Sequence, residues 1–370
     1  MKIRVLEVLP TLKRAGAEHV AVALACGLDR GRFETSLVTL YDPFPGGLEP
    51  VLEEQGIAVR PLGKRRGFDP RMFPRLASTL REFSPHVVHT HSYLLRYVLP
   101  AAVAARAAAF VHTVHNLAGR DVERFGRVVN RLAFRRGVKA VAAGGEVARS
   151  FRAVYGLDPA ATIPNGIDTD RYYRPGARDG WRRAHGFAPE DVLIASVARL
   201  DPQKDPLGLI AAFAGALAGE PRCHLVIAGD GALRQAAEEL MARLSLAGRV
   251  HLIGVRGDIP EILSACDLFA LASRWEGMPV ALMEAAAAGL PAVATSVDGA
   301  PEVVEHERTG LLVPPGDLRA LGDRLAELVR DERRRRELGE CAKVRSARFH
   351  VSRMIDSYAA LFERLAGAPR

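Results

Sequence analysis

The sequence predicts an α/β protein with two doubly wound domains, each a mostly parallel sheet covered by helices on both faces. A chain of 370 residues is too long for one ordinary hydrophobic core and indicates two domains. Short apolar runs alternate with segments of helical periodicity, and this alternation starts again in the second half. An aperiodic segment rich in Gly, Pro, Asp and Arg separates the halves, from Ile163 to about Glu190.

The strands are predicted at short runs of apolar and β-branched residues bounded by turn residues. In the first half these runs are residues 2–10, 34–41, 58–62, 86–91, 109–115 and 139–144. In the second half they are residues 192–200, 224–231, 250–254, 268–273, 291–297 and 310–316. Strands that alternate with helices imply parallel pairing and helices on both faces of the sheet.

Apolar residues recur every three to four positions between these runs, which predicts amphipathic helices. The clearest are residues 17–28, 73–83, 207–218, 232–244, 279–289, 318–329 and 352–365. The predicted domains are 1–168 and 169–350. The last helix, within residues 351–370, could belong to either domain, and we expect it to cross back to the N-terminal one.

Composition narrows the class of protein. Apolar residues make up 48% and charged residues 25% of the chain, which indicates a folded globular protein. No apolar run approaches the roughly 20 residues of a membrane-spanning helix, and the start MKIRVLEVLP favours a strand over a signal peptide. Because the cysteines lack metal or disulfide spacing, we expect reduced, buried thiols in a cytoplasmic protein. The cysteines are Cys26, Cys223, Cys266 and Cys341.

The net charge of +8 is concentrated in the N-terminal half. Residues 1–170 hold 24 Lys and Arg against 16 Asp and Glu, whereas the remaining residues hold 27 of each. Two segments carry much of the excess: Lys64, Arg65, Arg66, Arg71 and Arg75, then Arg120, Arg124, Arg127, Arg131, Arg135, Arg136 and Lys139. Apolar residues interleave the second segment, which is typical of a basic amphipathic helix. It indicates either an anionic partner, such as a membrane surface, or a solvated face. Nucleic acid is disfavoured because interleaved exposed aromatic residues are missing.

Two carboxylates, Glu276 and Glu284, bracket the segment EGMPVALME. We expect a helix that starts near Pro279, with the proline in its first turn. The backbone N–H groups expected to face the space before this helix are those of Gly277, Met278 and Val280. A diphosphate that carries sugar hydroxyls would suit such a place, because a helix N-terminus favours anions. Two solvated glutamates on a surface helix would explain the spacing equally well.

Two cations follow the first strand of the second half. Arg199 and Lys204 lie in SVARLDPQKD, where they could neutralise a diphosphate leaving group without a metal ion. Surface ion pairing with Asp201 or Asp205 is the alternative.

Other residues at strand ends are candidates for ligand contacts, since α/β proteins bind ligands at the carboxyl ends of their strands. Gly16 lies in a loop before the first helix, and Gly229 lies in the turn AGDG. Glycine permits close approach of a ligand, although an ordinary turn also needs one. Val255 and Arg256 end another strand, where backbone groups could meet a nucleobase. His115 ends a strand of the first half and would project into the same cleft.

These residues resemble the retaining glycosyltransferases of family 4, which have the GT-B fold of two facing Rossmann-like domains. The resemblance covers residues 1 to about 350. It is carried by Gly16 with Glu18, His115, NGID at 165–168, VARLDPQKD at 197–205, GDG at 229–231 and EGMPVALMEAAAAGLPAVAT at 276–295. The chain departs from the family at Ala15, where a second glycine is common.

The resemblance implies roles for individual residues. Arg199 and Lys204 would hold the donor diphosphate together with Gly16. Glu284 would bind the ribose hydroxyls, and Glu276 would bind the hydroxyls of the transferred sugar. The implied catalytic residues are His115, Arg199, Lys204 and Glu276. The implied donor-binding residues are Gly16, Arg199, Lys204, Gly229, Val255, Arg256, Glu276, Gly277, Met278, Pro279, Val280 and Glu284. The donor would be a UDP- or GDP-sugar, and neither a metal nor another cofactor is expected.

The implied reaction moves a hexose-type sugar to a lipid-linked or polysaccharide acceptor in bacterial cell-envelope or exopolysaccharide biosynthesis. It would proceed by front-face substitution, in which the leaving phosphate accepts the acceptor's proton. The N-terminal domain would bind the acceptor, and its basic excess favours an anionic acceptor at the inner membrane face. Two alternatives stay open. A nucleotide-sugar 2-epimerase needs acid/base groups beside the sugar, and a non-catalytic sugar-nucleotide-binding protein should lose the charged residues of its cleft.

Overall fold

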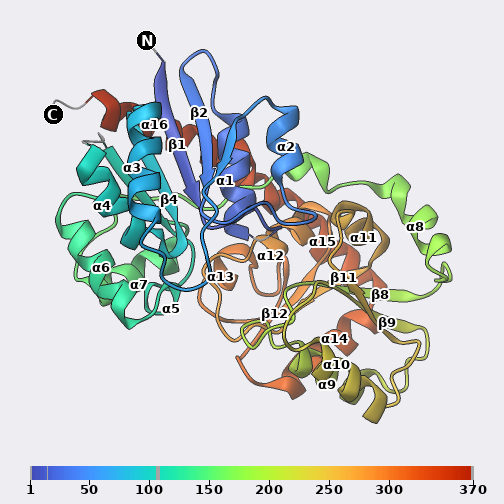
Figure 1. The fold of residues 1–370 in the computed structure, drawn as a ribbon. Coiled ribbons are helices and arrows are strands. Elements are labelled where there is room, and N and C mark those ends of the chain that lie inside the picture. Colours follow the sequence, from blue (N-terminus) through green and yellow to red (C-terminus); the bar gives the residue numbers. More distant parts are fainter. Residues whose placement is uncertain (1, 15, 106–108, 368–370) are drawn as a thin grey trace. The chain divides into compact units, whose positions relative to one another are not determined.

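The structure is a computed structural model that describes residues 2–14, 16–105 and 109–367. The chain divides into an N-terminal unit, Met1–Gly166 with Val351–Arg370, and a C-terminal unit, Ile167–His350. Each unit contains a parallel sheet with helices on both faces, which confirms the predicted α/β fold (Figure 1). The expected boundary at 168 lies two residues from the division between the units.

In the described part of the N-terminal unit the sheet has seven strands in the order β3-β2-β1-β4-β5-β6-β7, all paired in parallel. The strands are β1 (Ile3–Leu9), β2 (Phe33–Thr39), β3 (Val59–Pro61), β4 (Val87–His91), β5 (Ala109–Val114), β6 (Lys139–Ala142) and β7 (Ala161–Thr162). The first six were predicted. The sequence did not predict β7, because two residues are too few to form a pattern.

Helices cover both faces of this sheet. They are α1 (Gly16–Gly27), α2 (Glu49–Glu54), α3 (Met72–Phe83), α4 (Leu95–Ala105), α5 (Ala118–Asp121), α6 (Arg124–Arg135), α7 (Gly145–Tyr155) and α16 (Val351–Gly367), with a 3-10 turn η1 (Ser92–Leu94). Helices α1 and α16 pack on the face that carries Val5 and Val87. Helices α3 and α4 pack on the opposite face, against Leu6 and Val88. Both faces are therefore apolar, as parallel strands require.

The described residues of the C-terminal unit form a sheet of six parallel strands in the order β10-β9-β8-β11-β12-β13. The strands are β8 (Val192–Val197), β9 (Cys223–Ala228), β10 (Val250–Gly254), β11 (Leu268–Leu271), β12 (Ala292–Thr295) and β13 (Gly310–Val313). All six were predicted. Strands β8 and β11 are neighbours, and the chain turns to opposite sides of the sheet after each. This is the switch point at which doubly wound sheets open a crevice for ligands.

The helices of this unit are α8 (Arg178–Ala184), α9 (Pro206–Leu217), α10 (Arg234–Arg243), α11 (Ile259–Ala265), α12 (Val280–Ala287), α13 (Ala300–Val303), α14 (Leu318–Arg330) and α15 (Glu332–Ser346), with 3-10 turns η2 (Thr169–Arg171), η3 (Pro175–Ala177) and η4 (Ala347–Phe349). Helices α8, α11 and α12 cover the face that carries Leu193 and Phe269. Helices α9 and α14 cover the face that carries Ile194 and Leu268.

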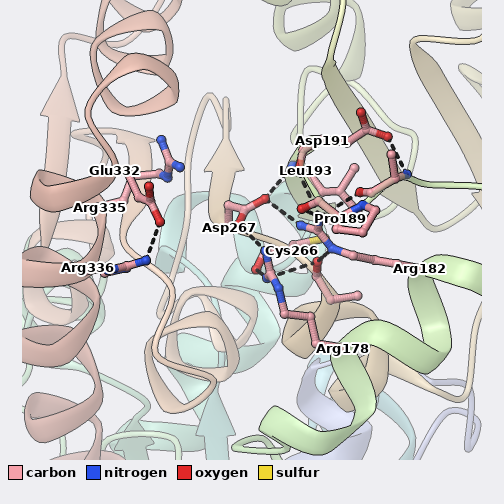
Figure 2. A network of polar contacts seen from close by, with 12 residues as sticks. Arg178, Arg182, Pro189, Asp191, Leu193, Cys266, Asp267, Glu332, Arg335 and Arg336 are labelled. Carbon is pink, nitrogen blue, oxygen red and sulfur yellow. Dashed lines mark hydrogen bonds and ion pairs between the residues drawn. The ribbon is translucent and has the colours of Figure 1, made fainter.

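The aperiodic segment that was predicted to separate the domains is ordered by a buried ion pair. Arg182 of α8 is 2% exposed, and its Nη2 donates to Asp267 Oδ2 at 2.8 Å. The same carboxylate accepts the Leu193 N–H at 2.7 Å and Arg178 Nη2 at 2.6 Å. Arg182 also donates to the backbone carbonyl of Ala265 at 2.8 Å. Figure 2 shows how these groups tie α8 to the start of β8 and β11.

The cysteine prediction is only partly right. Cys223 and Cys266 are buried, Cys26 is half-buried, and Cys341 is exposed on α15. Burial raises the pKa of the Cys223 thiol to about 12. All four are free thiols, but Cys341 lies on the solvent side of its helix, which cysteine spacing cannot reveal.

We predict that Asp267→Ala destabilises the C-terminal unit by about 3–5 kcal/mol, because it leaves the buried Arg182 guanidinium without its counter-ion. Both tryptophans, Trp181 and Trp275, belong to this unit, so urea unfolding followed by tryptophan fluorescence reports on it. The matched control is Asp179→Ala, which removes an exposed carboxylate of the same helix. Equal urea midpoints for Asp267→Ala and Asp179→Ala would contradict the stabilising role of the ion pair between Asp267 and Arg182.

Candidate functional site

The neighbouring strands β8 and β11 bring together two predicted site residues that lie 72 positions apart. Lys204 follows β8, Glu276 follows β11, and Lys204 Nζ lies 2.5 Å from Glu276 Oε1. Ser273 Oγ donates to the same oxygen at 2.6 Å. The Lys204 side chain is 17% exposed and that of Glu276 only 5%. Because the pair is largely shielded from water, its attraction exceeds that of a surface ion pair.

The loop that carries Glu276 is held from the end of β12. The Glu276 N–H donates to Asp298 Oδ2 at 2.9 Å, and Thr295 Oγ1 donates to the Ser273 carbonyl at 2.6 Å. Gly299 approaches this loop so closely that a Cβ would lie 1.8 Å from the Gly277 carbonyl oxygen. The carboxylate is therefore placed by backbone and side-chain contacts before any ligand binds.

Arg199 has a different environment from Lys204. Its side chain is 61% exposed, and it contacts Asp201 at 2.9 Å and Gln203 at 3.3 Å. The alternative of ion pairing with Asp201 thus applies to Arg199, whereas Lys204 pairs with Glu276. An exposed ion pair contributes little stability, so Arg199 can leave Asp201 for a ligand at small cost.

The helix after Glu276 begins one residue later than predicted. Pro279 is extended, with φ −76° and ψ 102°, and α12 starts at Val280. The expected proline in the first turn is therefore wrong, since Pro279 occupies the position before the helix. Glu284 lies on α12, and Tyr172 O–H donates to its Oε1 at 2.6 Å. Burial raises the pKa of Glu284 to about 7, although the Tyr172 hydroxyl and Arg171 oppose the shift.

Gly229 is required by the packing of strand-end loops against each other. A Cβ at this position would lie 1.9 Å from the Ala198 carbonyl oxygen, and the backbone φ is +147°. The Gly229 N–H donates to the Gly254 carbonyl at 2.7 Å. The close approach expected at this glycine is therefore made by the loop after β8, which also carries Arg199.

The remaining predicted donor residues of this unit differ in what they offer. Val255 is 67% exposed, and the Arg256 guanidinium donates to both oxygens of Asp258, each at 2.7 Å. Met278 is 5% exposed and belongs to the hydrophobic core, so only its backbone is available to a ligand. Gly277 and Pro279 are buried, and Val280 is half-buried.

Two predicted residues belong to the N-terminal unit. Gly16 is the first residue of α1 rather than part of the loop before it, and Ala15 lies outside the described residues. His115 follows β5 directly, and its Nε2 lies 2.7 Å from His91 Nδ1. His91 in turn contacts the buried carboxylate of Glu7.

Sequence reasoning missed several of these partners. Asp298 and Tyr172 contact the two glutamates only because distant segments meet. Ser273 lies three residues before Glu276, but no pattern showed that its hydroxyl meets the carboxylate. His89 and His91 did leave a signal, because HVVHTH places two histidines on one face of a strand.

A separate pocket of about 340 Å³ lies at the other edge of the C-terminal sheet. Its lining includes Arg178, Asp267, Pro291, Glu332 and Arg335, and Asp267 and Pro291 immediately precede β11 and β12. Glu332, Arg335 and Arg336 come from α15 (Figure 2). The predicted donor residues follow the strands instead, at the carboxyl edge, where ligands of such sheets bind.

We predict that Glu284 makes stability fall as the pH rises from about 5 to 8. An unfolded glutamate loses its proton near pH 4.5 and the folded one near 7, so the folded protein holds the extra proton in between. Glu284→Gln keeps the acceptor for Tyr172 and removes the titration. The melting temperature of Glu284→Gln minus that of the native protein should therefore increase from pH 5 to pH 8. A difference that stays constant over this range would contradict the raised pKa of Glu284.

Two family models match consecutive parts of the chain. Glycosyltransferase Family 4 matches residues 14–171, and Glycosyl transferases group 1 matches residues 177–345. The UDP-Gal:alpha-D-GlcNAc-diphosphoundecaprenol alpha-1,3-galactosyltransferase of Escherichia coli is 29% identical over 272 residues, 70% of each chain. The D-inositol 3-phosphate glycosyltransferase of Nocardia farcinica is 30% identical over 307 residues, which are 76% of this chain and 68% of the relative.

Solved structures share the fold. The crystal structure of Anabaena HepE in complex with UDP and glucose has a TM-score of 0.87 and 23% sequence identity, and the match covers 98% of this chain and 100% of the other. Both halves of the chain match glycosyltransferase models, and the fold matches along nearly its whole length. The chain therefore belongs to glycosyltransferase family 4 and has the GT-B fold.

Proposed function

We propose that this protein is a retaining hexosyltransferase that moves a sugar from a UDP- or GDP-sugar to a lipid-linked or polysaccharide acceptor in bacterial envelope or exopolysaccharide biosynthesis. The observation that carries this proposal is the shielded Lys204–Glu276 pair at the switch point of the C-terminal sheet. A cation and a carboxylate held side by side suit a donor that joins a diphosphate to a hydroxyl-rich sugar.

The pair can bind both parts of such a donor. The Lys204 ammonium has three N–H donors, and its bond to Glu276 uses one of them. The others are available to oxygens of the diphosphate, with Arg199 as a second, exposed cation. Lys204 and Ser273 both bond to Oε1 of Glu276, so Oε2 is available to a sugar hydroxyl.

This arrangement favours front-face substitution over a protein nucleophile. Glu276 is held by the Lys204 ammonium and the Ser273 hydroxyl, which stabilise its charge and lower its nucleophilicity. In the proposed step the bond from the anomeric carbon to the diphosphate breaks as the acceptor oxygen bonds to that carbon. The leaving phosphate oxygen takes the acceptor's proton. Lys204 and Arg199 then stabilise the charge that develops on the diphosphate.

The relatives support the substrate classes. The Escherichia coli relative is named for UDP-Gal and a diphosphoundecaprenol acceptor, and HepE was crystallised with UDP and glucose. A thermal-shift panel of UDP- and GDP-sugars should identify the donor here, because a ligand that binds only the folded state raises its melting temperature. Acceptor-free conversion of the donor to another nucleotide sugar would instead favour the epimerase.

We predict that Lys204→Ala lowers kcat at saturating donor by about a hundredfold or more, because the developing diphosphate charge loses its shielded cation. The matched control is Arg274→Ala, which removes an exposed cation that pairs with Asp205 in the same group of loops. Its kcat should stay within about twofold of the native value. Unchanged turnover of the Lys204 variant would exclude the proposed role.

The basic segment around α6 supports an anionic membrane surface as a partner. Phe125, Val128 and Leu132 are 67%, 66% and 46% exposed, and their spacing places them on one face of the helix. Exposed arginines flank this apolar stripe: Arg124, Arg131 and Arg135. An apolar stripe beside cations is typical of a helix that lies in a membrane interface. None of the helices in the described part of the chain has the length and apolar character needed to cross a membrane.

The other basic segment does not support this role. Lys64 is 7% exposed and donates to Tyr41 Oη at 3.0 Å. Arg71 pairs with Asp69 at 2.6 Å, and Arg75 donates to the Leu62 carbonyl. These three cations serve the fold of the N-terminal unit, whereas Arg65 and Arg66 of the same segment are exposed. We therefore assign membrane binding to α6, whose exposed arginines lie beside an apolar stripe.

We predict that replacing Phe125, Val128 and Leu132 with serine abolishes co-sedimentation with vesicles of phosphatidylglycerol and phosphatidylcholine. The apolar contribution to binding would be lost while every charge is kept. The control is Val344→Ser, which removes a 77% exposed apolar side chain of α15. Equal binding of the native protein to vesicles of phosphatidylcholine alone would exclude the anionic preference.

A further inference from the structure

The N-terminal sheet buries a carboxylate, Glu7, on which two histidines converge. Strand register places Glu7 of β1 beside His89 of β4, and His91 lies on the same face two residues later. Glu7 Oε1 lies 2.9 Å from His89 Nδ1, and Glu7 Oε2 lies 2.9 Å from His91 Nε2. All three side chains are fully buried. Neither the donor site nor the apolar core explains a charged group at this position.

The direction of each hydrogen bond follows from the carboxylate. Burial alone would raise the pKa of Glu7, but the charge of His89 and the hydrogen bonds from both histidines lower it to about 2. An ionised carboxylate only accepts hydrogen bonds, so His89 Nδ1 and His91 Nε2 both carry protons. Burial lowers the pKa of His91 to about 4. His91 is therefore neutral near pH 7, and its Nδ1 has a free lone pair.

This lone pair determines the state of His115. His91 Nδ1 lies 2.7 Å from His115 Nε2, so the proton between them belongs to His115. Burial keeps the pKa of His115 well below its usual value, which makes this ring neutral as well. Its Nδ1 is then unprotonated. In the described part of the chain this nitrogen is buried and has no hydrogen-bond partner. A buried acceptor without a donor is unfavourable, and a ligand hydroxyl would relieve it.

We propose that Glu7 and His91 are positioning residues that hold His115 in the Nε2–H tautomer, so that its Nδ1 accepts a hydrogen bond from a hydroxyl of the bound acceptor. The proposal rests on the proposed transferase function, because that function supplies the hydroxyl. His115 then acts as an acceptor that orients a substrate and does not donate a proton.

The second branch from Glu7 provides a matched control. His89 Nε2 lies 2.7 Å from Thr113 Oγ1, which lies 2.8 Å from the Tyr358 hydroxyl of α16. This branch is equally buried and shares the same carboxylate, but it ends at α16 and does not reach His115. Thr113→Val removes its hydroxyl with little change in volume.

The first test reads the tautomer directly and needs no activity. Side-chain ¹⁵N NMR of the histidines, with His115 assigned from the spectrum of His115→Ala, should show His115 protonated at Nε2. His91→Phe and the isosteric Glu7→Gln should convert this signal to a mixture of tautomers, whereas Thr113→Val should preserve it. A native His115 protonated at Nδ1, or a tautomer indifferent to both variants, would overturn the proposal. Stoichiometric metal in the purified protein would also overturn it, because Glu7, His89 and His91 each have a ligand atom close enough to share an ion.

The second test asks whether Glu7 and His91 act through His115. Glu7→Gln and His91→Phe should each lower kcat by about tenfold to a hundredfold through misorientation, and Thr113→Val should stay within about twofold. In a His115→Ala background the two changes should have no further effect. Multiplicative losses in that background would indicate a merely structural role. If no nucleotide sugar is turned over, the transferase proposal fails while the NMR result still stands.

Discussion

Parallel pairing is the constraint on which the rest of this structure depends. Parallel strands can be joined only by crossovers, and these place helices on both faces of the sheet. All carboxyl ends then gather at one edge, and the chain must change sides at one pair of neighbouring strands. In the C-terminal unit that pair is β8 and β11, and their loops carry Lys204 and Glu276. The candidate site is thus a consequence of strand order.

Buried and half-buried carboxylates recur in this protein, and each has a different kind of partner. Glu276 pairs with the partly exposed ammonium of Lys204. Asp267 pairs with the buried guanidinium of Arg182, and Glu7 pairs with His89 and His91. A buried charge must be paired and hydrogen-bonded, or it neutralises. Glu284 shows the second outcome, since it accepts a hydrogen bond from the neutral Tyr172 hydroxyl and burial raises its pKa to about 7. The partner therefore indicates the role: Asp267 fixes a helix, whereas Glu276 and Glu284 remain able to meet a ligand.

The two basic segments show that charge alone does not define a surface. Both segments contribute positive charge to the N-terminal half of the sequence. Lys64 is turned inward and bonds to Tyr41, while the arginines of α6 stay exposed beside Phe125 and Val128. The difference arises from the rest of the fold, because the Lys64 ammonium lies over the rings of Tyr41, which follows β2, and of Tyr97 in α4.

The sequence by itself determined twelve of the thirteen strands in the described part of the chain, several of the helices and the family, because these depend on local periodicity and on motifs such as EGMPVALME. It did not predict β7, α4, α7 or α15. It placed β8 to β13 correctly, but it put Pro279 inside a helix that begins after it, since a one-residue boundary depends on backbone angles that no pattern encodes. It did not show that the backbone of Ala198 packs against Gly229. Only the tertiary structure decided that Lys204 pairs with Glu276, that Tyr172 meets Glu284, and that Glu7 and His91 stand behind His115. Each of these contacts joins strands or loops that lie far apart in the chain. Strand order and burial determine which of these segments meet, and both are properties of the whole fold.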